Sequence, residues 1–506
     1  MAAAAAFGLL VAARAAFGPL SFPVPIRTPI NIESFFGLLL TLTLVLRSGS
    51  GVSKPQPVRA AWAALLAALV AAAFWRASDI YFLADDFFHV VRANTFEWPR
   101  LRPYWTTPEG NAFFRPLGHF FLAGMANWSH YDPRWWHWDI LTFHAANAIL
   151  VSVLAARLGL GRIAALFAGA LFAVHGATPE SAVWITGWFG VLPAFFTLLG
   201  LLAFLKYFEN SWWGVACLAC MILAFVSKES AYAFPLIALL LVVARRIPLK
   251  RAAWILGALF AMAFVIFAYR WHVLGGIGGY IDPQSGGLLF LELGLVQVLR
   301  SLLLRVWAVL YFPINWSVQP EWWLGMLVLF YIGALLWIAA RGGTKLPGLF
   351  PAGFVLLASL PPLEQLLIGP DLEKSRALYL PLIGFCLLLA AAIDSLEGRA
   401  RWFAPAAITL FHVAALQHNI SIWRQAGELA HQTCLSASRC VEPASTVRVR
   451  DLPGTVNGVY FLGAGFGECI GMQTGSPPLD VQRAADPTAQ VDLFWDAAAS
   501  ALRCAK

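Results

Sequence analysis

The sequence predicts an all-α polytopic membrane protein. Of its 506 residues, 60% are hydrophobic and only 12% are charged, and the mean hydropathy is +0.70. Soluble domains carry about 25% charged residues, twice this fraction. The apolar residues form long runs, which short basic or Pro/Gly-containing pieces separate. This composition excludes a water-soluble enzyme, a collagen-like chain, a coiled coil and a disordered chain.

The apolar runs are long enough to cross a bilayer many times. A spanning helix needs roughly 20 apolar residues, and we predict about 13 such helices. They lie at residues 1–18, 33–47, 58–76, 138–157, 163–177, 187–204, 212–227, 230–246, 252–269, 322–340, 348–366, 378–395 and 402–419. The segment 289–313 is also apolar, but Arg300 and Arg305 interrupt it and Pro313 ends it. We expect this segment to form an interfacial or partly buried helix.

Basic residues flank alternate connections between the predicted helices. The groups are Arg47 with Lys54 and Arg59, Arg157 with Arg162, Lys206, Arg245 and Arg246 with Lys250 and Arg251, Arg341 with Lys345, and Arg399 with Arg401. The positive-inside rule places them in the cytoplasm, so the N-terminus is cytoplasmic and the C-terminal tail periplasmic. The formal net charge of +8 comes from these helix ends and forms no extended patch. We therefore expect membrane lipids as partners and no nucleic acid.

Four parts follow from this topology. They are N-terminal transmembrane helices at 1–76, a large outer loop with interfacial helices at 77–137, a transmembrane core at 138–419 and a small outer tail at 420–506. The tail contains Cys434, Cys440, Cys469 and Cys504. Cysteines concentrated in a short hydrophilic segment on an oxidising face predict disulfides, and all three connectivities are open.

The outer loop begins with an acidic pair. Asp85 and Asp86, in YFLADDFFHV, directly follow the third predicted span. Carboxylates at a membrane boundary are unfavourable unless they have a function. Adjacent side chains on a helix or turn diverge, so we expect different roles: one a general base, the other a ligand for an ion, a substrate or an arginine. The alternative is a solvated pair at a helix end.

Cations on the outer face are a second candidate feature. Lys374 and Arg376, in GPDLEKSRALYLP, break the positive-inside pattern and could bind a lipid phosphate. The alternative is a surface network with neighbouring acids. Arg115 of the outer loop is a further candidate for this phosphate.

Other polar residues lie at outer helix ends or within helices. Glu180, His89 and the pair Lys228 and Glu229 are candidates for donor or acceptor contacts, although a buried structural ion pair explains the last two equally well. His144 and Asn147 share a helix face at i, i+3, which favours hydrogen bonds between helices. No HExxH or comparable ligand spacing occurs, so no metal site is predicted.

Six motifs resemble, in the same order, the membrane part of GT-C glycosyltransferases. They are ADDFFH, FFRPLGHFF, HWDILTFHAANAIL, LFAVHGATPESAVWITG, VSKESA and SRALYLPLIGFCLLL. The sequence is similar to the transmembrane-and-tetratricopeptide O-mannosyltransferases and their bacterial relatives over roughly residues 77–400. No tetratricopeptide repeats are seen, and Trp188 and Gly190 stand where relatives commonly have an arginine and an acid.

The resemblance implies an enzyme of the bacterial inner membrane that takes a sugar from a polyprenyl-phosphate carrier, such as undecaprenyl phosphate. The acceptor, on the periplasmic face, would be a glycan, a lipid or a protein. By similarity, Asp85 is the catalytic base, Arg376 contacts the carrier phosphate and Glu180 occupies the family's acidic position. No cofactor is firmly implied, and a requirement for a divalent cation is left open.

Two other functions are compatible with the same features. A transporter or flippase for a lipid-linked sugar would also bind the carrier, but such proteins tend to contain paired repeats with broken helices, which are not found here. A polymerase or ligase of O-antigen-type glycans would also use outer arginines but would not need the acidic pair.

Overall fold

A computed structural model describes residues 2–19, 29–48, 60–95, 102–107, 113–280, 286–341, 346, 348–441, 446–484 and 491–505. Three residues of the predicted cytoplasmic groups, Lys54, Arg59 and Lys345, lie outside these ranges. Parts of the outer loop between 96 and 112 also lie outside them.

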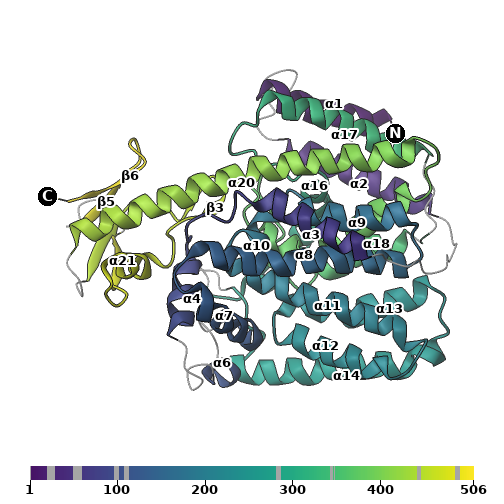
Figure 1. The fold of residues 1–506 in the computed structure, drawn as a ribbon, viewed down its shortest axis with the longest axis horizontal. Helices are drawn as coiled ribbons and strands as arrows, with labels where there is room; N and C mark the ends of the chain where they lie inside the picture. The colour runs from purple at the N-terminus through teal and green to yellow at the C-terminus, as the bar shows by residue number, and fades with distance from the viewer. Residues whose placement is uncertain are drawn as a thin grey trace.

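The structure is mainly a bundle of apolar helices (Figure 1). Each of the 13 predicted apolar segments contains a helix. These helices are α1 (Ala2–Phe17), α2 (Ile30–Leu46), α3 (Ala60–Phe74), α8 (Pro133–Arg157), α9 (Arg162–Val174), α11 (Trp188–Tyr207), α12 (Trp213–Phe225), α13 (Phe234–Ala244), α14 (Leu249–Leu274), α17 (Trp322–Arg341), α18 (Leu349–Ser359), α19 (Pro381–Ile393) and α20 (Ala400–Cys440).

Not all of these helices have the length that a full span requires. Among the described residues, four are long and apolar enough to cross a membrane: Pro133–Arg157, Ile185–Tyr207, Leu249–Leu274 and Trp322–Arg341. Eight others are apolar but have only 10–17 residues. The chain is thus a membrane protein with several apolar helices, and the number of 13 crossings stays a prediction.

The segment 289–313 is divided into short pieces. They are η3 (Leu289–Glu292), α15 (Leu295–Arg300), the π-helical turn η4 (Ser301–Arg305) and α16 (Val306–Tyr311). Residues 306–311 are all buried, whereas most of α15 is exposed. The structure therefore has a partly buried helix here, as the two arginines predict.

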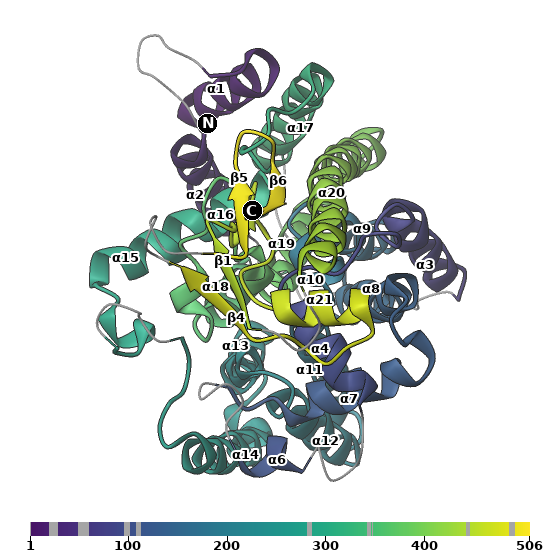
Figure 2. The same ribbon diagram turned by 90° about the vertical axis from the view of Figure 1, so that its left-hand side faces the viewer.

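The polar elements gather at two opposite ends of the bundle. The outer loop forms α4 (Asp85–Asn94), α6 (Pro103–Thr106) and α7 (Pro116–Ser129), which lie at the same end as the tail (Figures 1 and 2). At the other end, Arg157 contacts both Glu209 (3.4 Å) and Arg245, which donates to its carbonyl oxygen (3.3 Å). This separation agrees with the predicted sidedness of the connections.

The tail departs from the all-α prediction. Helix α20 does not end near residue 419 but continues to Cys440 and carries the tail away from the bundle (Figure 1). The tail contains the helix α21 (Phe466–Thr474), a four-stranded sheet of order β4-β1-β5-β6 and a two-stranded sheet β2-β3. Their bounds are β1 (Val447–Arg450), β2 (Thr455–Val456), β3 (Val459–Tyr460), β4 (Val481–Ala484), β5 (Leu493–Asp496) and β6 (Ala501–Cys504).

Two disulfides join the tail to α20. Cys434 pairs with Cys469 and Cys440 with Cys504, which is one of the three connectivities left open by the sequence. Both bonds start from the last two turns of α20 and therefore attach α21 and β6 to one rigid helix.

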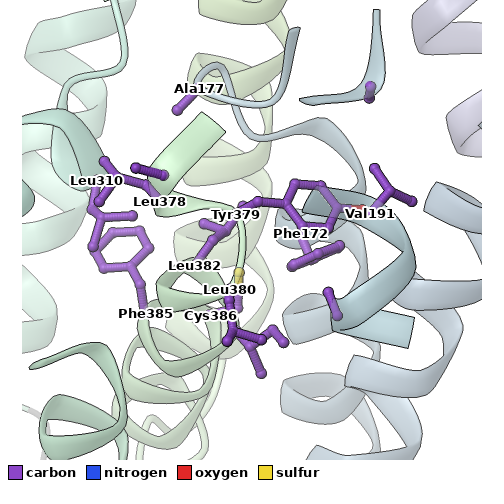
Figure 3. Close-up of a cluster of buried hydrophobic side chains, with 14 of the residues drawn as sticks. Phe172, Ala177, Val191, Leu310, Leu378, Tyr379, Leu380, Leu382, Phe385 and Cys386 are labelled. Carbon is purple, nitrogen blue, oxygen red and sulfur yellow. The ribbon is translucent and has the colours of Figure 1, made fainter. Parts of the chain in front are cut away.

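A buried cluster supports the segment that follows Arg376. Leu378, Leu380 and Phe385 pack with Phe172, Leu310 and their neighbours (Figure 3). Within it the Tyr379 hydroxyl contacts His144 Nδ1 (2.7 Å) and accepts from Asn147 Nδ2 (3.2 Å). The hydrogen-bonding role predicted for this histidine and asparagine is confirmed.

We expect peptide mapping to recover the two disulfides. Non-reducing digestion and mass spectrometry of protein from an oxidising compartment should yield peptides that link Cys434 to Cys469 and Cys440 to Cys504. Each bond should contribute about 2–4 kcal/mol to the stability of the tail. Free thiols at all four positions, or cross-pairing between the two sets, would contradict this arrangement.

Candidate functional site

Arg376 lies at the outer helix ends and is held from several sides. It belongs to the short helix η6 (Ser375–Leu378), directly before α19. Its guanidinium forms a buried ion pair with Glu180, which stands in α10 (Pro179–Ala182). The same carboxylate accepts from Ser375 Oγ (3.0 Å) and from the Arg376 backbone nitrogen (3.3 Å). The sequence-predicted residues Arg376 and Glu180 are therefore in direct contact.

Two aromatic rings enclose the Arg376 guanidinium. Its Cζ lies 5.2 Å from the centroid of Trp184 and 5.0 Å from that of Tyr460, and these two rings stack on each other at 4.9 Å. Burial is the largest single influence on the pKa of Arg376 and lowers it, but Glu180, Tyr280 and Tyr460 together outweigh burial, so the pKa is raised well above its ordinary value. Arg376 thus stays charged, with cation–π contacts to one residue of the bundle and one of the tail.

A second buried ion pair joins the outer loop to the bundle. Arg115 Nε donates to Glu229 Oε2 (3.1 Å), and a second guanidinium nitrogen donates to the other carboxylate oxygen. The Arg115 Cζ also lies 4.1 Å from the Phe113 ring centroid. A two-pronged contact of this kind fixes both orientation and distance.

Lys228 directly precedes Glu229 of the second ion pair. The residue is 6% exposed, and no described residue forms an ion pair or a hydrogen bond with its ammonium group. Burial, and next the positive charge of Arg115, lower its pKa to about 7, with Glu229 acting in the opposite direction. The charges of Arg376 and Glu180 also influence this pKa, to a smaller extent. It is a buried cation without a counter-ion in the described part of the chain.

A cavity of about 340 Å³ adjoins the second pair. Its lining includes Glu229, Arg270 of α14, Glu364 of η5 (Leu363–Gln365) and apolar side chains such as Phe113 and Phe267. Arg270 is buried, and its Nε has no hydrogen-bond partner among the described residues. Burial, and next the charge of Glu229, raise the pKa of Glu364 to about 7. The lining of this cavity thus combines an apolar wall with one guanidinium group, Arg270, and two carboxyl groups, Glu229 and Glu364.

The two acidic residues of the outer loop have different environments. Asp86 is buried, and its Oδ1 accepts from the backbone nitrogen (2.8 Å) and the hydroxyl (2.9 Å) of Thr186, while Oδ2 accepts from Leu83 N (3.2 Å). Burial raises the pKa of Asp86 to about 7 although these hydrogen bonds lower it. Asp85, the first residue of α4, is partly exposed and takes no part in this network. The two carboxylates thus differ in burial, and the different roles expected for them stay a prediction.

The acidic pair and Arg376 are joined through two residues. The Trp184 indole nitrogen donates to Leu83 O (3.1 Å), and Ala84 N donates to Phe461 O (2.7 Å). Trp184 and Tyr460, the neighbour of Phe461, are the residues that enclose Arg376. The start of α4 and the guanidinium therefore belong to one compact arrangement at the outer end of the bundle.

The remaining predicted residues lie at different distances from this arrangement. The His89 ring contacts Phe189 (5.4 Å) and His119 (5.5 Å), and Phe189 in turn lies 5.6 Å from Arg115 Cζ. Lys374 has φ +74° at the start of η6, and its side chain makes no hydrogen bond or ion pair with the described residues. The structure thus brings His89 to the edge of the site and leaves Lys374 outside the ion-pair cluster.

Two charged residues of the site, Arg270 and Glu364, were not selected from the sequence. Arg270 stands in the long apolar segment LFAMAFVIFAYRWHVL, where an ionisable residue already suggests a function. Glu364, in PPLEQ, has no comparable signal, because only folding brings it near Glu229. As to metals, no three His, Cys, Asp or Glu residues in the described ranges are grouped as ligands.

Comparisons with known proteins found similarity to solved structures but none to family models or curated sequences. No family model matches the sequence, and no curated protein matches it. The structure is similar to ArnT from Cupriavidus metallidurans bound to undecaprenyl phosphate, at 13% identity and a TM-score of 0.46, over 85% of this chain and 87% of that one. The apo state of the same protein matches at 14% identity and a TM-score of 0.41, over 84% and 86%.

An Archaeoglobus fulgidus oligosaccharyltransferase tethered with an acceptor peptide is also similar. The identity is 12% and the TM-score 0.39, over 90% of this chain and 63% of that one. At these identities and TM-scores, the likenesses assign neither an activity nor a substrate to this chain.

We expect substitution of Asp86 to lower the stability of the protein more than substitution of Asp85 does. Asp86→Ala leaves the buried Thr186 nitrogen without its acceptor and should destabilise the protein by about 1–3 kcal/mol. Asp85→Asn, at the partly exposed start of α4, should lower the unfolding temperature less than Asp86→Ala does. Thermal unfolding of both variants in the same detergent would measure this, and equal Tm values would contradict the anchoring role of Asp86.

Proposed function

We propose that this protein is a membrane glycosyltransferase of the GT-C type. It would transfer a sugar from a polyprenyl-phosphate donor to an acceptor hydroxyl on the outer, periplasmic face. The observation that carries the proposal is the buried Lys228, which has no ion-pair partner among the described residues and directly precedes Glu229, a residue of the second ion pair and of the cavity lining. A buried cation without a partner is unfavourable, and an anionic ligand removes that penalty.

The charges of the site suit a phosphate on an apolar tail. Arg115, Lys228, Arg270 and Arg376 supply four cations, whereas Glu180, Glu229 and Glu364 supply at most three anions. Glu364 has its pKa raised to about 7, so it is partly protonated at neutral pH and the positive excess grows. The prenyl chain would lie against the apolar wall of the cavity, and the phosphate would lie near Lys228.

The acidic pair supplies the base. Thr186 and Leu83 donate hydrogen bonds to Asp86, which gives this carboxylate an anchoring role. We assign to Asp85, at the partly exposed start of α4, the role of the base that takes the proton of the acceptor hydroxyl. The hydroxyl oxygen then forms a bond to the anomeric carbon as the bond from that carbon to the phosphate oxygen breaks. The departing polyprenyl phosphate keeps the electron pair, and the cations stabilise its charge. A single displacement inverts the anomeric centre.

Transfer by purified protein tests this function. The protein would be incubated in liposomes with a panel of polyprenyl-phosphate sugars and a membrane extract as acceptor, and products would be identified by mass spectrometry. We expect glycosylated product with wild type, and a loss of about 100-fold or more with Asp85→Asn. Full activity of Asp85→Asn and of Arg376→Ala, or carrier translocation without any transfer, would refute the proposal.

The role of Lys228 gives a separate prediction. Lys228→Met removes the charge but keeps the length, and should raise KM for the donor about tenfold or more, because a hydrogen bond to a charged group contributes about 1.5–3 kcal/mol. Lys250→Met, at the exposed start of α14, serves as the matched control and should leave KM unchanged.

The pH dependence follows from the lowered pKa of Lys228. The ammonium form prevails below pH 7 and is lost as the pH rises through about 7 in the free protein. Donor affinity should therefore fall above neutral pH in wild type. Titration of donor binding against pH would show this step, and an identical profile in Lys228→Met would contradict the assignment.

A further inference from the structure

The part of α20 beyond the bundle has one polar face. Its exposed residues are Ser421, Arg424, Gln425, Glu428, Gln432 and, near the end of the helix, Arg439, and their spacing keeps them on one face. The opposite face is buried and includes Ala426, Gly427 and Ala430. Residues with this spacing lie side by side on a helix, so the polar groups form a continuous stripe.

This stripe forms one wall of a groove. Gly427 allows the approach of α20 to the segment before α4, because a Cβ there would lie 2.8 Å from Ile80 Cγ2 and 3.1 Å from Tyr81 N. Between α20, residues 79–81 and residues 132–134 lies a cavity of about 860 Å³. A second cavity of about 460 Å³ lies between Tyr81, α4 and residues 468–478 of the tail. Tyr81 and His431 line both cavities.

The two shared residues form a fixed aromatic platform. The rings of Tyr81 and His431 stack with centroids 4.2 Å apart, and Gln473 Nε2 donates to the Tyr81 hydroxyl (2.6 Å). Flat rings pack well against the C–H faces of sugar rings. Side-chain amides and carboxylates around them can donate to and accept from hydroxyl groups.

The charges of the groove select against an anionic ligand. The lining carboxylates are Asp79, Asp132, Glu428 and Glu468, and the lining guanidinium groups are Arg134 and Arg424. Asp132 and Arg134 neutralise each other at 2.8 Å. The groove therefore differs from the cationic site around Lys228 and would repel a phosphate group. A neutral ligand with many hydroxyl groups matches it best.

We propose that this groove binds the acceptor through a neutral oligosaccharide. The assignment rests on the proposed transfer reaction, because it names the substrate whose hydroxyl Asp85 deprotonates. The groove adjoins the helix that begins with Asp85: Tyr81 lies four positions before Asp85, its ring contacts Phe87 of α4 (5.7 Å), and Val91 of α4 lines the second cavity.

A binding measurement that requires no catalysis tests whether the groove binds an oligosaccharide. Saturation-transfer NMR would be recorded on the full-length protein in detergent with neutral di- to tetrasaccharides of mannose, glucose, galactose and N-acetylglucosamine, and with a basic and an acidic octapeptide. We expect at least one oligosaccharide to bind, and Tyr81→Ala and Gln432→Ala to weaken its Kd about tenfold. Gln482→Ala, an equivalent change in exposed β4, should bind as wild type.

The binding results test the groove assignment independently of whether the protein transfers sugar. Binding of none of these oligosaccharides, binding of a peptide instead, or an unchanged Kd in Gln432→Ala would overturn the groove assignment, even if the protein transfers sugar. Oligosaccharide binding that both groove variants weaken would support the assignment even in a protein without transfer activity. Because Gln432 is exposed, its variant tests the groove regardless of how Tyr81→Ala folds.

Discussion

The charge balance around Lys228 is the constraint on which the functional site depends. Arg115 and Arg376 each have a carboxylate partner, and Lys228, which directly precedes Glu229, has none among the described residues. Burying charge is tolerated in proteins when it is paired or when function requires it. In the proposed function, the phosphate of the donor is the anion that balances this cation, and the prenyl chain occupies the cavity that Glu229 lines.

The tail contributes directly to the site. Tyr460 covers one side of the Arg376 guanidinium, and Phe461 O accepts the hydrogen bond of Ala84 N. Ala84 has φ +46°, an uncommon conformation for a residue with a side chain, and it sets the direction in which Asp85 leaves the turn. Gly465 packs against this turn so closely that a Cβ would lie 2.3 Å from Ala84 O. A rigid connection of the tail to α20 therefore helps to position the proposed base.

Sequence patterns predicted the helical bundle well because hydropathy and basic residues report directly on the bilayer. The same patterns placed Arg376 and Glu180 individually on the outer face. They did not predict the ion pair between these residues, because ion pairs between distant segments leave no local pattern in the sequence. Glu364 and the aromatic residue Tyr460 were not recognised for the same reason. The strands of the tail were missed because they have two to four residues each and no periodic signal. The continuation of α20 past residue 419 was missed because its polar stripe ends the apolar run that defined the predicted span.

The most direct test of the account is a cryo-electron microscopy structure of the protein with a polyprenyl phosphate bound in nanodiscs. The account predicts a phosphate within about 3 Å of Lys228 Nζ, at hydrogen-bond distance, with the prenyl chain in the cavity lined by Phe113, Arg270 and Glu364. It further predicts that the carboxylate of Asp85 faces the phosphate across a space large enough for a sugar ring. A phosphate bound elsewhere, with Lys228 still buried and without an anion, would contradict it.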